Sequence, residues 1–359
     1  MTTSFPVRAR RVSGTAELLD AIPYLLGFRP TESLVLLGLR DGCLVVTARL
    51  DLADTGQPDL VDDTVAAMVR GGSDAFIVVV ADDRCEMPVA AHDDLPWAAA
   101  VVAVDECLIG LGAVLHDALL LCRSRWWSYL CGAAQCCPPE GNVQPASPSA
   151  FAAAAAFEGV VALPDRATLA ATLEPLPDTR RAALAPFLTA AENTAVAALL
   201  AGGVAGHERE LVRELIRLAD ASDAAQWSTP DDAAAARLGV ALTGVAVRDE
   251  VWVAVDSRRL DGRALWAELA RRCPSPYDAA PTFLLAWANW RAGNGVLARL
   301  AAERVLASDP SYSAADLLLA ALANAVDPRT FPVLGSDPPD ELRARRRRGR
   351  RGAAARTPR

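Results

Sequence analysis

The chain of 359 residues is 52% apolar and 22% charged, which is enough apolar surface to bury the cores of two globular domains. Its net charge of −8 is unevenly divided, because residues 340–359 carry +7 and residues 1–339 therefore carry −15. An acidic body repels nucleic acid. The sequence contains no lysine, which excludes a phosphate-binding loop that ends in Gly-Lys-Ser or Gly-Lys-Thr.

No run of 18 apolar residues is free of charged side chains, and the N-terminus lacks the apolar region of a secretion signal. We therefore expect no membrane span and a cytoplasmic location. The chain contains eight cysteines. In a reducing compartment they indicate free thiols, with a metal or redox site as the alternative, and they argue against a disulfide framework.

The pattern over residues 1–145 predicts an α/β domain with a mixed sheet of about five strands. Two apolar, β-branched runs at 33–39 and 44–52 flank an Asp-Gly pair, which is a strong hairpin signal. The remaining elements follow from apolar periodicity and from glycine or proline breaks: helices at 13–24, 59–70 and 96–112, a buried strand at 75–81, and a second hairpin formed by 114–122 and 126–130.

A connector rich in proline, glycine and serine, Pro138–Pro148, separates this domain from the rest of the chain. Residues 146–335 predict a second, all-α domain. Its helices are expected at 149–157, 165–173, 179–200, 208–221, 231–247 and 261–272, while 248–255 is compatible with a helix or a strand. Residues 336–359 form an arginine-rich tail that we expect to be disordered.

The segment Pro281–Leu319 predicts two helices with a tight Gly-Asn-Gly turn between them and a stop at Asp309-Pro310. This spacing resembles a tetratricopeptide repeat, although Asn289 and Ala302 stand where that motif has tyrosine and phenylalanine. A stable stack needs about three repeats, and the sequence has one clear copy. We therefore expect a helical domain with one repeat-like hairpin.

The most unusual stretch is RWWSYLCGAAQCCPPEG, at Arg125–Gly141. Four residues separate Cys131 from Cys136, which is a spacing that structural zinc sites use, and Cys137 would be a third ligand. His116 is the candidate for the fourth. If the turn of the second hairpin has two residues, His116 lies opposite or diagonal to Cys131, whereas a three-residue loop turns it away.

Two alternatives to a metal site remain open for the same cysteines. A redox pair would join Cys131 to Cys136 or Cys137 in a disulfide, with Cα atoms closer than about 7 Å. The third alternative is a set of core thiols beside Trp126 and Trp127 that point apart and bind nothing. Zinc is thus the one cofactor that the cysteine spacing suggests, and the core alternative needs no cofactor.

For function, the sequence favours a non-enzymatic interaction or scaffold protein that binds a protein partner through its helical domain. No complete catalytic motif is present in the sequence. The alternative is an enzyme or ligand-binding protein with its site at the strand ends, near Asp82, Asp83 and the segment Trp126–Cys137. Nucleic acid could bind only at the tail arginines Arg343, Arg345, Arg346, Arg347, Arg348, Arg350 and Arg351.

Three segments together, Pro23–Leu39, Arg125–Gly141 and Phe283–Tyr312, resemble the actinobacterial family known as domain of unknown function 4192. The resemblance spans most of the chain apart from the arginine tail. It implies a bacterial cytosolic protein from a high-GC organism. It brings no known activity and no established site residues.

Overall fold

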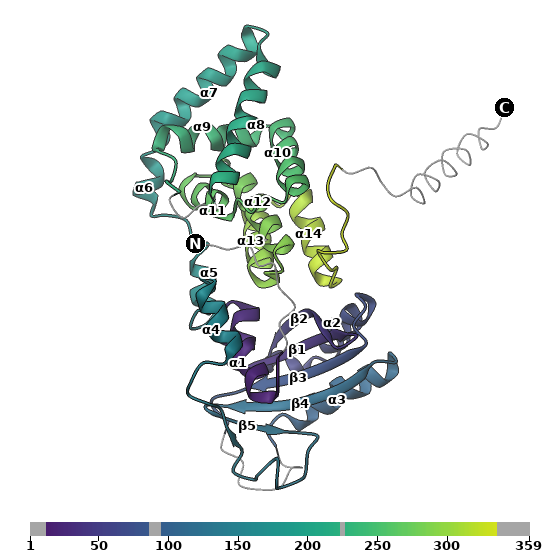
Figure 1. The fold of residues 1–359 in the computed structure, drawn as a ribbon. Coiled ribbons are helices and arrows are strands. Elements are labelled where there is room, and N and C mark those ends of the chain that lie inside the picture. The colour runs from purple at the N-terminus through teal and green to yellow at the C-terminus, as the bar shows by residue number, and fades with distance from the viewer. Residues whose placement is uncertain (1–11, 86–94, 223–226, 336–359) are drawn as a thin grey trace, which may run out of the picture.

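The computed structural model describes residues 12–85, 95–222 and 227–335, in which a mixed sheet is followed by a helical region (Figure 1). The strands are β1 (Ser33–Arg40), β2 (Cys43–Asp51), β3 (Ala75–Ala81), β4 (Val114–Cys122), β5 (Arg125–Ser128) and β6 (Asn142–Val143). The predicted fold class is confirmed. The expected disorder of the arginine tail and its binding to nucleic acid concern residues outside the described ranges.

The six strands are ordered β2-β1-β3-β4-β5-β6, and only β3 and β4 run parallel. The helix α3 (Ala98–Gly110) makes the crossover between these two strands. The prediction of about five strands missed β6, which is two residues long and pairs with β5 from inside the predicted connector. The connector therefore completes the edge of the sheet.

Both faces of the sheet are covered, which explains the continuous apolar runs of β1 and β3. Leu34 and Leu36 pack under α2 (Pro58–Arg70) and α3, while Val35 and Leu37 pack under α1 (Thr15–Leu26). Each fully buried leucine stabilises the fold by about 1.5–3 kcal/mol. A short 3-10 helix, η1 (Leu52–Gly56), joins β2 to α2.

Both predicted hairpins are present. Asp41 and Gly42 have φ values of 51° and 73°, the backbone of the tight turn that Asp-Gly pairs favour. In the second hairpin Cys122 pairs with Arg125, so its turn has two residues. This turn length is the one that places His116 on the Cys131 side of the hairpin.

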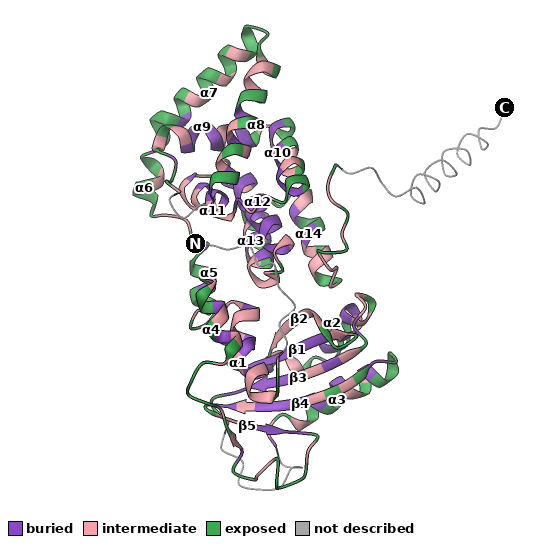
Figure 2. Ribbon diagram, in the orientation of Figure 1, coloured by how far each residue is buried: buried purple, intermediate pink, exposed green. Residues whose placement is uncertain are grey.

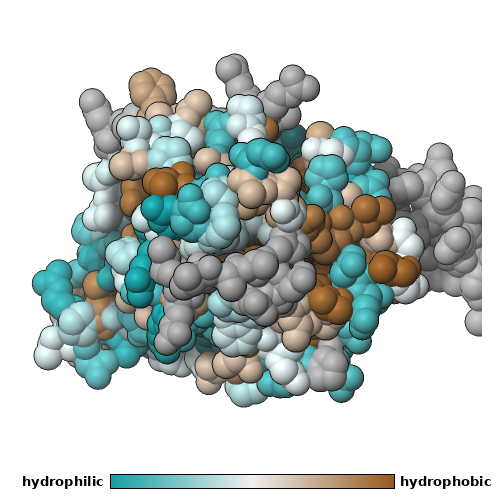
Figure 3. Space-filling view, turned by 90° about the horizontal axis from the view of Figure 1, so that it is seen from below, coloured by the Kyte–Doolittle hydropathy of each residue, from teal (hydrophilic) through white to brown (hydrophobic). Residues whose placement is uncertain are grey.

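The outer end of α3 exposes apolar side chains, including Ile109 and Leu111. A view from below, onto the sheet end of the molecule, shows hydrophobic side chains gathered on one side (Figure 3).

The helical region begins with α4 (Ala150–Phe157) and α5 (Arg166–Ala171), and α4 lies beside α1 (Figure 1). Phe151 of α4 contacts Tyr24 of α1 with ring centroids 6.2 Å apart. Leu169 of α5 belongs to the apolar cluster between α1 and the sheet. Leu300 of a much later helix packs against the same cluster. The second face of the sheet is therefore built from distant parts of the chain.

The other helices are α6 (Asp178–Ala182), α7 (Ala185–Leu200), α8 (Val204–Ala221), α9 (Asp232–Thr243), α10 (Val245–Arg258), α11 (Arg263–Arg272), α12 (Ala279–Arg291), α13 (Gly295–Ser308) and α14 (Ser313–Ala323). The predicted helix 179–200 is two helices, because Pro186 begins a new one in its first turn. The predicted helix 231–247 ends at Gly244, and the ambiguous segment 248–255 is helical within α10.

The predicted hairpin of Pro281–Leu319 is present as α12 and α13, with Gly293 at φ 83° in the turn. Helix α12 is buried on all sides in the middle of the helical region (Figure 2). Trp252 of α10 packs edge-on against Phe283 and Trp287 of α12, with ring centroids 4.7 and 4.9 Å apart. Such aromatic pairs add about 0.5–1.5 kcal/mol each to the area they bury.

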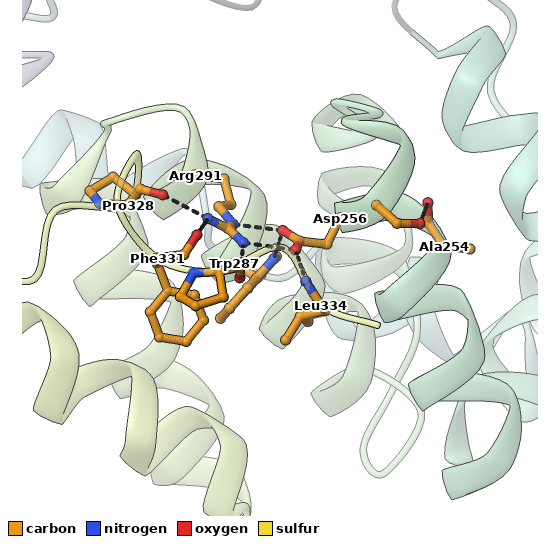
Figure 4. Close-up of polar contacts among 9 residues, drawn as sticks. Ala254, Asp256, Trp287, Arg291, Pro328, Phe331 and Leu334 are labelled. Carbon is orange, nitrogen blue, oxygen red and sulfur yellow. Dashed lines mark hydrogen bonds and ion pairs between the residues drawn. The ribbon is translucent and has the colours of Figure 1, made fainter. Parts of the chain in front are cut away.

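An ion pair between Asp256 of α10 and Arg291 of α12 anchors the last described residues (Figure 4). The Asp256 side chain is 2% exposed, and its two oxygens accept hydrogen bonds from Arg291 Nε and Nη2 at 2.6 and 2.7 Å. The same carboxylate accepts from Trp287 Nε1 at 3.0 Å and from the Leu334 amide at 2.7 Å. We call this arrangement the Asp256–Arg291 clamp.

The guanidinium of the clamp is satisfied on its other side by the returning chain. Arg291 donates to the carbonyls of Pro328, Phe331 and Pro332 at 2.6 to 3.0 Å. It also lies over three aromatic rings, with 5.2 Å to the ring of Trp287. Removing either charge leaves the other without its counter-ion in a largely apolar environment, although its neutral hydrogen-bond partners remain.

We predict that Asp256→Ala lowers the free energy of unfolding by about 3–5 kcal/mol, the cost of stranding a buried charge. The matched control is Asp249→Ala on the same helix, because the Asp249 side chain is 50% exposed in its pair with Arg248. The control should cost less than about 1 kcal/mol. Urea denaturation measures both. Equal losses in the two variants would show that the clamp is no stronger than a surface pair.

Candidate functional site

Three cysteine sulfurs converge in the loop that follows β5. The Sγ atoms of Cys131, Cys136 and Cys137 all lie within 4.8 Å of one another, and those of Cys131 and Cys136 are 2.9 Å apart. Cys136 is exposed and the other two are half-buried. We call these three residues the thiol cluster. The alternative of core thiols required buried sulfurs that point apart. These sulfurs converge instead, and none of the three residues is fully buried.

Trp127 forms the base on which this loop folds. Its ring is buried, and its Nε1 donates to the Pro139 carbonyl at 2.9 Å. The backbone of Gly141, at φ 77°, packs against the Trp127 ring, and a Cβ at this position would come within 2.4 Å of a ring atom. Arg125 Nη1 donates to the Gly141 carbonyl at 2.8 Å. The tryptophan and the glycine of the motif thus fix the end of the loop.

A tight turn brings the sulfurs together. The amides of Cys136 and Cys137 both donate to the Ala133 carbonyl, at 3.1 and 2.8 Å. Asn142 of β6 donates to the Cys136 carbonyl at 3.0 Å. Asn142 of β6 therefore binds the turn itself, while Trp127 binds the later part of the loop at Pro139.

The contacts within the thiol cluster shift the pKa values of its three thiols in different directions. The thiol of Cys136, the amide of Ala133 and the thiol of Cys137 lower the pKa of Cys131, in that order of size. Burial, followed by hydrogen bonds to the other two sulfurs, raises the pKa of Cys137 to about 12. The hydrogen bond to Cys131 raises the pKa of Cys136. Cys131 is thus the thiol of the cluster whose ionised form its neighbours favour, while the other two are held toward their protonated forms.

His116 does not join the thiol cluster. The register is the one that the two-residue turn predicts, but the last bond of the ladder runs from the Tyr129 amide to the Ala118 carbonyl at 2.8 Å. Beyond it the chain leaves β4 to close over Trp127. Among the described residues, the group of ligand atoms within 4.8 Å contains the three cysteines and no histidine.

Asp117, next to His116, is a feature that sequence reasoning missed. Its carboxylate accepts from the Ala118 amide at 2.8 Å and the Ser128 hydroxyl at 3.3 Å. Burial raises the pKa of Asp117 despite these hydrogen bonds. The carboxylate acts on Cys131 as a like charge. The hairpin register that places His116 also places Asp117 near this end of the hairpin, but no motif of its own marks Asp117 in the sequence.

The strand-end aspartates are used to connect loops. Asp82 accepts from Trp97 Nε1 at 2.9 Å and from the Arg84 amide at 3.0 Å. Asp83 accepts from the Arg123 amide at 2.6 Å, which ties the end of β3 to the β4–β5 turn. Both carboxylates therefore accept hydrogen bonds from backbone amides, and Asp82 also accepts one from an indole.

A second feature lies on the helices. A groove of about 370 Å³ runs between α7, α8 and the end of α9. Its lining is mostly apolar and small, with Phe187, Ala191 and Ala195 on one wall and Val240 and Val247 on the other. This groove and the thiol cluster are at opposite ends of the molecule (Figure 1).

The fold and these sites define a mixed α/β protein with a helical region and a thiol cluster at the sheet edge. A family model described as Domain of unknown function (DUF4192) matches residues 16–329. The chain belongs to this family, which confirms the resemblance seen in the sequence. No curated protein and no solved structure matches the chain.

We predict that Asp117→Asn, which keeps the acceptor oxygen and removes the buried charge, stabilises the protein at pH 7. The gain should be less than about 1.4 kcal/mol, because the Asp117 side chain is only partly shielded from water. A carboxyl whose folded pKa is raised is penalised where it is ionised in both states. The penalty vanishes as the pH falls through the raised pKa toward the unfolded value of 3.8.

Thermal unfolding of both proteins between pH 7 and about pH 4 measures this difference, which should shrink as the pH falls. Asp117→Ala is the control, because it removes the charge but also leaves Ala118 and Ser128 without their acceptor. It should be less stable than the Asn variant at every pH. An Asn variant that is less stable than wild type at pH 7 would contradict the argument.

Proposed function

We propose that this protein binds one thiophilic metal ion, zinc, at Cys131, Cys136 and Cys137. The observation that carries the proposal is the convergence of the three sulfur atoms within 4.8 Å. In a tetrahedral zinc site with Zn–S bonds of about 2.3 Å, neighbouring sulfurs are about 3.8 Å apart. The Cys131–Cys136 distance of 2.9 Å is shorter than this value and the other two distances are at most 4.8 Å, so small side-chain rotations would suffice to place all three sulfurs around one ion.

The chemistry of the donors supports zinc over hard cations. Thiolates are soft ligands that select zinc or copper(I), whereas magnesium and calcium take oxygen ligands. Cys131, with its lowered pKa, is the first donor, and binding of the ion would displace the protons of Cys136 and Cys137. The nearby carboxylate of Asp117 adds negative charge that favours a dication.

The proposed role of the ion is structural. It would cross-link the turn that Trp127 and β6 hold only by neutral hydrogen bonds, at a sheet edge where the chain has no other regular structure between Ser128 and Asn142. The fourth position would be filled by water or by a partner's side chain, because three protein ligands leave one site open. Free thiols require a reducing compartment, in accord with the predicted cytoplasmic location.

Zinc content of the purified protein tests the proposal. We expect about one zinc per chain, measured by atomic emission after dialysis, and a lower melting temperature after chelation. Cys131→Ser and Cys136→Ser should lose the ion. The control is Cys43→Ser, an exposed cysteine on β2 outside the cluster, and His116→Ala should also keep the ion.

A protein that neither contains zinc nor takes it up on addition would contradict the proposal. Equal zinc content in Cys131→Ser and Cys43→Ser would place the ion elsewhere and contradict it as well. Retention in His116→Ala, together with loss in the cysteine variants, would identify the thiols as the ligand set.

We propose, as a second function, that the groove on the helical region binds a protein partner. This is the interaction role predicted from the sequence. An apolar groove between helices is a usual binding site for the apolar face of another helix. The small side chains of α7 keep this groove open, and the repeat-like hairpin lies in the same helical region. Binding here is independent of the thiol cluster, which lies at the other end of the molecule.

A further inference from the structure

Two sulfurs of the thiol cluster are in direct contact. The Sγ atoms of Cys131 and Cys136 are 2.9 Å apart, and a disulfide bond is about 2.05 Å long, so the two atoms need to close by less than about 1 Å. Residues 132–135 between them are all exposed, and no helix or strand contains them. Closure of this pair therefore displaces no side chain of the core.

The other pairings within the cluster are less favourable. Cys136 and Cys137 are adjacent, and Cα atoms of adjacent residues are about 3.8 Å apart, which is closer than the roughly 4.4 Å that ordinary disulfides span at least. Cys136 is exposed, whereas Cys137 is half-buried, so a small oxidant in solvent reaches Cys136 more readily. Contact and exposure together select Cys131 and Cys136 as the pair that oxidation joins.

The cysteines outside the cluster have no such arrangement. Cys85, Cys122 and Cys273 are buried, which shields their sulfurs from solvent. Cys43 is exposed on β2, but it belongs to no group of converging ligand atoms among the residues that the structure describes. Cys43 is therefore an internal reference for the reactivity of an ordinary exposed thiol.

We infer that a peroxide oxidises Cys131 and Cys136 to a disulfide and that this oxidation releases the metal ion from the thiol cluster. The inference rests on the metal-binding function proposed above, and it adds a means of regulating that site. The ion loses two of its three protein ligands, and Cys137 alone is too few for a site that needs four. The turn stays cross-linked, because the new bond joins two of the residues that the ion had joined.

The reaction consumes one peroxide for each disulfide. One thiolate of the pair attacks an oxygen of hydrogen peroxide, the O–O bond breaks, and the hydroxide that leaves takes a proton from solvent to form water. The other thiolate attacks the sulfur of the resulting sulfenic acid, the S–O bond breaks, and a second hydroxide leaves and is protonated. The two sulfurs together lose two electrons, which the peroxide gains. A dithiol reductant reverses the change by thiol–disulfide exchange.

The first arm of the test uses full-length protein freed of metal by chelation and treated with hydrogen peroxide. One tryptic peptide, residues 126–166, carries all three thiols of the cluster. After alkylation with iodoacetamide, mass spectrometry should show this peptide lighter by two hydrogens and alkylated once, at Cys137. The disulfide should form at least about tenfold faster than Cys43 loses its reactivity toward iodoacetamide.

Cys131→Ser removes one partner of the pair, so the disulfide should be lost. The sulfenic acid of Cys136 should then persist, and dimedone should capture it. The matched control is Cys137→Ser, which removes the third thiol of the same cluster and should form the disulfide as fast as wild type. Circular dichroism of both variants should equal that of wild type, which separates lost chemistry from lost structure.

The second arm uses the zinc-loaded protein. Hydrogen peroxide should release about one zinc per disulfide formed, at the same rate as the disulfide appears, measured with a colorimetric zinc indicator. Cys43→Ser should release zinc in the same way. Treatment with dithiothreitol should restore zinc uptake.

Three results would overturn the inference. They are zinc that stays bound after the disulfide has formed, wild-type thiols that oxidise to sulfinic acids without joining, and an unchanged disulfide yield in Cys131→Ser. Each of them leaves the metal-binding proposal standing if the reduced protein holds zinc. A protein that forms the disulfide but takes up no zinc would instead overturn the metal-binding proposal, and the regulated release with it.

Discussion

A buried carboxylate fixes the geometry of the helical region. Asp256 has lost almost all contact with water, so it is stable as an anion only where Arg291 and the indole of Trp287 reach it together. That requirement sets the distance between α10 and α12. Because α12 is the buried centre of the region, the helices that pack around it depend on the position that this pair gives it. The returning chain then completes the coordination of Arg291 with three carbonyl groups.

Three contacts in the molecule share one feature, an indole N–H that donates to an oxygen in a loop or on a neighbouring helix. Trp97 holds Asp82 at the end of β3, Trp127 holds Pro139 under the thiol cluster, and Trp287 holds Asp256. A tryptophan supplies apolar contact area and one directed donor, so it can close a loop and cover a core at the same time. Trp97, Trp127 and Trp287 each combine the two roles in this aromatic-poor sequence.

The sequence predicted what local patterns determine. Apolar runs around Asp41-Gly42 defined the first hairpin, and cysteine spacing identified the three sulfurs that converge. It failed where the outcome depends on contacts distant in the chain. The two residues of β6 have no periodicity of their own, and β5 alone makes them a strand. The second hairpin has the predicted two-residue turn, but its pairing ends before Cys131, and His116 lies outside the group of converging ligand atoms. The pairing of Asp256 with Arg291 spans two helices and leaves no local signal.

The apolar cluster between α1 and the sheet has a consequence for the order of folding. It receives side chains from α1, from α5 and, more than a hundred residues later, from Leu300 of α13. During synthesis the sheet can form its strands early, but one of its faces stays partly uncovered until α13 has left the ribosome. Contacts of such long sequence separation slow folding and expose apolar surface in the meantime. The nascent sheet is therefore the species that a chaperone would have to protect.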